Sequence, residues 1–108
     1  GIPAYAVISS QLGCPIVEGN EVLTIIPATA KREKMKRAME ASDNVVLMKV
    51  YRNFPDVIEM LEEHGMAKNA VLVSRAGLDG EQVFHDVAAH RTERPNYLST
   101  ILTRRDAK

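Results

Sequence analysis

The stretch NVVLMKVYRNFPDVIEML, residues 44–61, places an apolar run directly before an amphipathic segment. The run at Asn44–Val50 predicts a buried strand, because short apolar runs bounded by turn residues are typical of one. Asn53 suits the N-cap of the helix that follows, and Gly65 suits the position just after its end. The apolar residues of that helix recur at the spacing of one helical face: Phe54, Val57, Ile58 and Leu61. A strand that leads so directly into a helix favours an α/β domain.

Strands and helices alternate on both sides of this stretch. Further strands are predicted at Val22–Pro27, Ala70–Gly77, Glu81–His85 and Tyr97–Arg104, and further helices at Ala4–Leu12, Lys31–Ala41 and Asp86–Arg91. Thr29 is the expected N-cap of the helix that carries Met35, Ala38 and Met39 as its apolar stripe. Asp79-Gly80 is a hairpin signal, so the strand after it should return antiparallel.

This order of elements predicts one α/β domain over residues 1–108. Its sheet should be mixed and five-stranded, parallel in its first part, antiparallel toward the end, and flanked by helices. The last residues, Arg104–Lys108, are expected to fray.

Composition excludes several classes of protein. Fourteen basic and fourteen acidic residues give a formal net charge of zero, which argues against nucleic-acid binding. Cys14 is the only cysteine of the sequence, which rules out an internal disulfide and suits the reducing cytoplasm. The apolar runs are too short to cross a membrane, for which about 20 residues are needed. His64, His85 and His90 lack a metal-ligand spacing, so no metal site is predicted.

Two predicted strands end in segments that are candidates for ligand contact, because ligands of open α/β sheets bind beyond the carboxyl ends of parallel strands. These segments are VLMKVYRN, residues 46–53, and VSRAGLDGE, residues 73–81. The residues alone leave open whether the segments bind a ligand or only form turns. Gly77 and Gly80 fit either reading, since glycine serves close backbone approach and tight turns alike.

Four stretches in this order resemble the carboxyl-terminal half of the tetrapyrrole methylases: GIPAYAVISSQLGCPIVEGNEVLTIIPAT, NVVLMKVYRNFPDVIEML, AVLVSRAGLDGEQVFHDV and YLSTILTRR. Within that family, EGNE with IIPAT, VVLMKV and RAGLDGE is most similar to the members that methylate carbon-20 of precorrin-2 or cobalt-factor II in cobalamin biosynthesis. The resemblance implies S-adenosyl-L-methionine as the cofactor and a reduced tetrapyrrole as the substrate, with no metal required.

The resemblance also implies a domain arrangement. Family members have two α/β domains that hold the cofactor between them, and they are commonly homodimers. This chain is therefore expected to be the second domain, with the N-terminal domain of the same chain as its partner. By itself it is expected to be inactive, because half of a cleft cannot align two substrates.

Residue roles follow from the same resemblance. The cofactor-contacting positions are Pro3, Ala4, Met48, Gly77 and Leu98. Met48 is expected to touch the cofactor through backbone and side chain alike, while Pro3 departs from the serine or threonine commoner in the family. The substrate's carboxylates are expected to face Lys49, Arg52 and Arg75, because arginine pairs well with carboxylates. No residue argues for a catalytic base.

Two alternatives stay open at the level of the sequence. The chain could be a non-catalytic α/β binding or dimerisation module, which its neutral charge and small size allow. It could also belong to a family member that methylates a different tetrapyrrole position.

Overall fold

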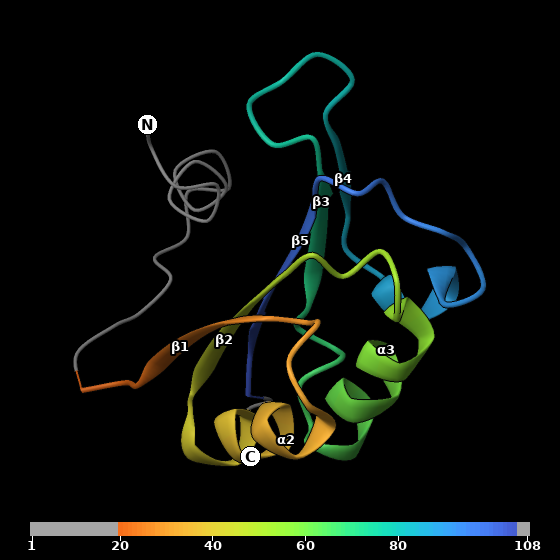
Figure 1. Ribbon diagram of the computed structural model, residues 1–108. Helices are drawn as coiled ribbons and strands as arrows, with labels where there is room; N and C mark the ends of the chain where they lie inside the picture. Colours follow the sequence, from red (N-terminus) through yellow and green to blue (C-terminus); the bar gives the residue numbers. More distant parts are fainter. Residues whose placement is uncertain (1–19, 106–108) are drawn as a thin grey trace.

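The computed structural model describes residues 20–105 (Figure 1). Its elements are, in chain order, β1 (Leu23–Pro27), α2 (Arg32–Ala41), β2 (Asn44–Met48), α3 (Phe54–Glu63), β3 (Val71–Ser74), β4 (Gln82–Phe84), the 3₁₀ helix η1 (Val87–His90) and β5 (Ser99–Arg104). Strand and helix alternate as far as β3, and the chain then returns through Asp79-Gly80 as an antiparallel hairpin, as predicted. The helix expected at Ala4–Leu12 lies outside the described residues.

The strands form one five-stranded sheet in the order β1-β2-β5-β3-β4. β1 and β2 run parallel, β5 is antiparallel to both β2 and β3, and β4 is antiparallel to β3. The predicted fold, an α/β domain with a mixed sheet flanked by helices, is therefore confirmed. The last strand lies inside the sheet, between β2 and β3, rather than at an edge (Figure 1).

This topology gathers several strand ends along one edge of the sheet. β1, β2 and β3 point the same way, so their carboxyl ends lie together with the amino end of β5. Met48 is paired with Pro27 on one side and with Thr100 on the other, and Ser74 is paired with Ser99. The residues that follow β2 and β3 are thereby brought beside the start of β5.

Both α-helices pack on the same face of the sheet (Figure 1). The buried residues of α2 are Met35 and Met39, members of its predicted stripe. The buried face of α3 contains the predicted Phe54, Val57, Ile58 and Leu61. These side chains form one apolar cluster with the sheet residues Ile26, Val45, Leu47, Leu72 and Ile101. Burial of this surface is the main favourable contribution to folding.

The strands at the gathered edge are shorter than predicted. β2 ends at Met48 and β3 at Ser74, each short of its predicted end, and β5 begins only at Ser99. The residues after β2 and β3 are Lys49 and Arg75, whose φ values are 57° and 55°. A residue in the left-handed region cannot continue an extended strand, and an apolar pattern does not reveal such a residue.

The predicted helix caps are only partly right. α2 begins after Lys31 without a side-chain cap, so the expectation for Thr29 is wrong. Asn53 does occupy the N-cap of α3, but its Nδ2 donates to the carbonyl of Ala28 at 2.7 Å instead of its carboxamide oxygen capping the helix. Gly65 follows the end of α3 with a φ of 66°, as predicted.

Fraying of the carboxyl end is wrong for its first two residues. Arg104 is the last residue of β5, and its Nη2 lies 2.7 Å from Oε1 of Glu21. Arg105 donates from Nη2 to the carbonyl oxygens of Met39 and Ser42, the latter at 2.9 Å. Both arginines therefore bind β5 to distant parts of the chain.

Candidate functional site

A hollow of about 370 Å³, which we call the edge pocket, lies where β2 and β3 end and β5 begins. Three pieces of chain line it: Met48, Lys49 and Tyr51; Arg75, Ala76 and Leu78; and Tyr97, Leu98, Ser99 and Thr100. The register of the sheet brings these pieces together. The carboxyl ends of parallel strands are the usual ligand position in α/β sheets.

The end of β2 contributes one wall of the edge pocket. The carbonyl of Met48 accepts a hydrogen bond of 2.7 Å from the backbone N–H of Ala28, which ties the strand end to the turn after β1. The half-buried Met48 side chain is therefore the better placed part of the residue for ligand contact. Lys49 is exposed beside it, and Tyr51 follows on the same wall.

The loop between β3 and β4 contributes the second wall. Nε of Arg75 donates to the carbonyl of Asp79 at 2.7 Å, so the side chain bridges its own loop. Gly80 has a φ of 80°, and a Cβ there would meet Nε of Arg75 at 3.4 Å. The backbone N–H of Arg75 donates to the carbonyl of Leu98 at 2.9 Å, which joins this loop to the segment before β5. Arg75 therefore shapes the loop and also lines the pocket.

The structure brings part of the predicted site together. Met48, Lys49, Arg75 and Leu98 all line the edge pocket. Gly77, with a φ of 74°, lies in the loop between the lining residues Ala76 and Leu78 but does not line the pocket itself.

Arg52 lies outside the pocket lining. Its Nε donates to the hydroxyl of Tyr51 at 3.1 Å, and its guanidinium carbon lies 5.5 Å from the centre of that ring. Arg52 can therefore affect the pocket through Tyr51. Pro3 and Ala4 lie outside the described residues.

Six of the lining residues were not among the predicted site residues: Tyr51, Ala76 and Leu78, which lie within the two candidate strand-end segments, and Tyr97, Ser99 and Thr100, which do not. Tyr97 is 63% exposed and Leu78 is 52% exposed, which is unusual for large apolar side chains outside a binding surface. Strand-end position alone identified the segment around Tyr51. For the segment of Tyr97 only the family resemblance, through Leu98, gave a signal, because the segment reaches the pocket through the pairing of β5 with β2 and β3.

The lining has a definite chemical character. Apolar and aromatic side chains make up most of it, and its two charged residues, Lys49 and Arg75, are both cations. No carboxylate lines it among residues 20–105. Such a surface suits a ligand with a flat apolar body and anionic groups, since rings pack on aromatic side chains and cations pair with carboxylates.

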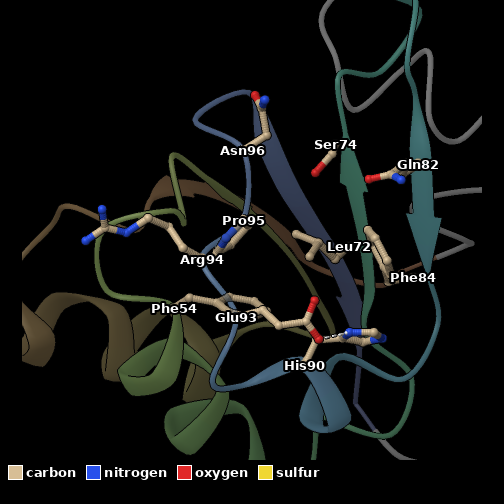
Figure 2. A pocket seen from close by; sticks show the side chains of 10 residues that line it. All are labelled: Phe54, Leu72, Ser74, Gln82, Phe84, His90, Glu93, Arg94, Pro95 and Asn96. Atoms are coloured by element: carbon tan, nitrogen blue, oxygen red, sulfur yellow. Dashed lines mark hydrogen bonds and ion pairs between the residues drawn. The ribbon is translucent and has the colours of Figure 1, made fainter.

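A second, smaller hollow of about 120 Å³ lies on the helical face of the sheet (Figure 2). At one end Glu93 turns toward His90, with Oε2 2.5 Å from Nδ1, and the imidazole meets the Phe84 ring edge-on at 4.8 Å. At the other end Ser74 lies 2.9 Å, oxygen to oxygen, from Ser99, which lines the edge pocket. A pair of hydrogen-bonded serine hydroxyls thus joins the linings of the two hollows, and no predicted site residue of the described chain lines the smaller one.

Within residues 20–105, no three His, Cys, Asp or Glu side chains gather as they would around a metal ion. Over the same range, neither α-helix has the length and apolar character that crossing a membrane requires.

Comparison with known proteins gives matches over most of the chain. The sequence model of the family described as Tetrapyrrole (Corrin/Porphyrin) Methylases matches residues 1–90. The chain is 32% identical over 103 residues to the cobalt-precorrin-2 C(20)-methyltransferase of Salmonella typhimurium, covering 94% of this chain and 44% of that protein. The chain thus spans less than half the length of this curated relative.

Solved structures share the fold. The methyltransferase CobJ aligns with a TM-score of 0.74 at 15% identity, over 99% of this chain and 49% of CobJ. A uroporphyrin-III C-methyl transferase from Thermus thermophilus, complexed with S-adenyl homocysteine, aligns with a TM-score of 0.62 at 14% identity, over 90% of this chain and 48% of that one. At these identities the likeness establishes the fold.

Proposed function

The chain belongs to the tetrapyrrole (corrin/porphyrin) methylases, and from this we propose that it forms part of an S-adenosyl-L-methionine-dependent methyltransferase of cobalamin biosynthesis. Its acceptor is a reduced tetrapyrrole, precorrin-2 or cobalt-factor II, and the methylated atom is carbon-20. The observation that carries the proposal is the edge pocket, in which Met48, Lys49, Arg75 and Leu98 meet. The relative from Salmonella typhimurium supports the choice of carbon-20.

The edge pocket fits the proposed cofactor in size and lining. Its volume of about 370 Å³ falls within the roughly 300–1,000 Å³ typical of small-molecule sites. Met48 and Leu98 offer apolar surface for the cofactor at the ends of β2 and β5. Gly77 contributes by letting the loop after β3 pass close to the ligand. Pro3 and Ala4 complete the proposed cofactor-contacting set.

The residues of this chain act mainly by binding and orienting. When bound, S-adenosyl-L-methionine supplies an electrophilic methyl group on its sulfonium. Lys49 and Arg75 hold carboxylates of the acceptor, and Arg52 acts on the same side through Tyr51. The apolar lining excludes water, so that catalysis rests on alignment of the two reactants. We assign no catalytic base to residues 20–105.

We also propose that these residues form the carboxyl-terminal domain of a two-domain enzyme. The coverage of 44% and 49% of the lengths of the relatives supports this arrangement. The N-terminal domain of the same chain then closes the edge pocket from the other side. The assembled enzyme is proposed to be cytoplasmic and a homodimer, and light scattering on the natural gene product tests the dimeric state.

The proposed reaction is tested with the natural gene product that contains these residues. It is incubated with methyl-labelled S-adenosyl-L-methionine and, separately, with precorrin-2, cobalt-factor II and uroporphyrinogen III. We expect label at carbon-20 of precorrin-2 or cobalt-factor II and none in uroporphyrinogen III. The 108-residue chain alone should transfer no label, because it provides only one side of the cleft.

Each other outcome favours a different alternative. Label at another ring carbon would indicate a family member of different regiochemistry. No label from a folded protein that binds S-adenosylhomocysteine would exclude the three acceptors. Absence of cofactor binding as well would favour the non-catalytic module.

A further inference from the structure

Lys49 combines three features: a left-handed backbone, an exposed charge and a position in the lining of the edge pocket. We propose that Lys49 is the principal acceptor-binding cation of the edge pocket, which orients the acceptor by binding one of its carboxylates. This inference rests on the proposed function, which includes a tetrapyrrole acceptor, and goes beyond it by assigning recognition chiefly to one side chain.

The backbone conformation of Lys49 is the first observation. Its φ of 57° lies in the left-handed region, where a residue with a Cβ is disfavoured and glycine is not. The position follows β2 directly and lines the pocket. The backbone of Lys49 is therefore strained at the wall of a ligand-sized pocket. Strained residues of this kind are typically found at functional sites.

The charge environment of Lys49 is the second observation. Its ammonium group has no hydrogen bond or ion pair with any residue of the described range, and it is exposed. The pocket lining within that range contains no carboxylate that would compete for it. An ammonium group has three donors and no acceptor, so its natural partner here is an anion supplied by the ligand.

The neighbouring cations are the third observation, because each already uses one of its donors within the chain. Nε of Arg75 donates to the carbonyl of Asp79 at 2.7 Å and holds its own loop. Nε of Arg52 donates to the hydroxyl of Tyr51 at 3.1 Å, and Arg52 does not line the pocket. Lys49 is thus the cation of this edge whose donors are all available, whereas Arg75 also holds its own loop.

The test measures binding of a probe rather than turnover. The natural gene product is titrated with uroporphyrin III, a flat macrocycle with eight carboxylates, and with its octamethyl ester, which lacks the charges. Binding is followed by porphyrin fluorescence at low and high salt. Binding of S-adenosylhomocysteine is measured in parallel by calorimetry on every variant.

The variants separate charge from backbone conformation. Lys49→Gln removes the charge and keeps the Cβ, Lys49→Gly removes the charge and the strain, and Lys49→Arg keeps the charge. We expect both neutral variants to bind uroporphyrin III about tenfold more weakly, as loss of a charge-assisted hydrogen bond predicts. Lys49→Arg should bind within about twofold of the unsubstituted protein, since a salt link of similar reach is retained.

Matched controls identify the source of the effect. Lys68→Gln removes an exposed lysine before the amino end of β3, at the opposite edge of the sheet, and should leave binding unchanged. Binding of the octamethyl ester should be equal for all variants, and the difference between variants should shrink at high salt because ions screen the pair.

The outcomes distinguish this inference from the proposed function. If the protein methylates its acceptor but Lys49→Gln binds uroporphyrin III as tightly as the parent, the role of Lys49 is refuted and the reaction stands. If Lys49 controls uroporphyrin binding while no acceptor is methylated, the recognition role stands and the proposed reaction fails. Absence of porphyrin binding in the parent protein overturns the role of Lys49, while the labelling experiment decides the reaction independently.

Discussion

Lys49 and Arg75 each occupy the first position after a strand, with φ values of 57° and 55°. A residue with a Cβ loses roughly 1–2 kcal/mol in this region, whereas glycine enters it freely. Both side chains line the edge pocket. At both positions the chain therefore keeps a cation where glycine would adopt the same backbone conformation without strain, as is common at functional sites.

The strain at Lys49 predicts an increase in stability on substitution. Lys49→Gly should raise the free energy of unfolding of the 108-residue chain by about 0.5–1 kcal/mol, because relief of the left-handed conformation outweighs the added entropy of glycine in the unfolded state. Urea denaturation followed by circular dichroism measures this change.

Lys49→Ala is the matched control, since it removes the charge but keeps the Cβ and the strain. Its stability should stay within about 0.5 kcal/mol of the parent. A loss of stability in Lys49→Gly, or an equal gain in both variants, would show that the backbone at this position is not strained.

At the scale of elements, α2 depends on a residue far away in the sequence. The helix has no basic residue in its last turn, where a cation would complement the negative end of the helix dipole. Arg105, which follows β5, supplies that charge by donating to the carbonyls of Met39 and Ser42. Its Nη1 also lies 3.4 Å from the carbonyl of His64, just after α3. One guanidinium thus joins the ends of both helices to the last strand.

This contact predicts a clear loss of stability. Arg105→Met keeps much of the aliphatic stem but removes the donors, and should lower the free energy of unfolding by about 1–2 kcal/mol. The shift of the urea midpoint at constant slope reports the change.

Arg94→Met provides the comparison, because Arg94 is exposed and points away from the hollow that it borders (Figure 2). Its effect should be below about 0.5 kcal/mol. Equal effects of the two substitutions would mean that the contacts of Arg105 contribute nothing to stability.

At the scale of the whole molecule, the position of β5 organises both the core and the site. The strand lies between β2 and β3 and separates two elements that are closer to each other in the chain. Its residue Ile101 is fully buried, whereas Ile25 on the edge strand β1 is 41% exposed. The same strand begins at Ser99, beside the edge pocket. Loss of the strand would therefore remove the middle of the sheet and one wall of the pocket.

The sheet order predicts different costs for the same substitution. Ile101→Ala should lower the free energy of unfolding by about 2–5 kcal/mol, because it leaves a cavity in the central strand. Ile25→Ala should cost less than about 1 kcal/mol, since much of that side chain is already in water. Thermal and urea unfolding of the two variants, made side by side, test the order. Similar losses in both would contradict the central placement of β5.

Helix and strand positions followed from periodicity because that signal is local. The apolar face of α3, the apolar run of β2 and the hairpin at Asp79-Gly80 can each be recognised from residues that lie close together in the sequence. The ends of β2 and β3 were harder to predict, because a left-handed lysine or arginine has no compositional signature. The side-chain cap expected of Asn53 is wrong for a related reason: its side chain bonds the distant Ala28 carbonyl rather than its own helix.

The candidate site was predictable only in part. Rules for strand ends and the family resemblance identified Met48, Lys49, Arg75 and Leu98, which do meet in one pocket. They also included Arg52, which lies outside the lining, and omitted Tyr51 and Tyr97, which belong to it. Which residues contact the pocket depends on the order of the strands in the sheet. That order is set by contacts between residues far apart in the chain.

The sequence by itself determined the family, the α/β class and the order of helices and strands, because apolar periodicity and turn residues act over a few neighbouring positions. Only the tertiary structure decided that β5 lies between β2 and β3, that Lys49 and Arg75 turn left-handed, and that Arg105 caps α2. These features depend on contacts between residues far apart in the chain, where packing and hydrogen bonding across the sheet outweigh local preference.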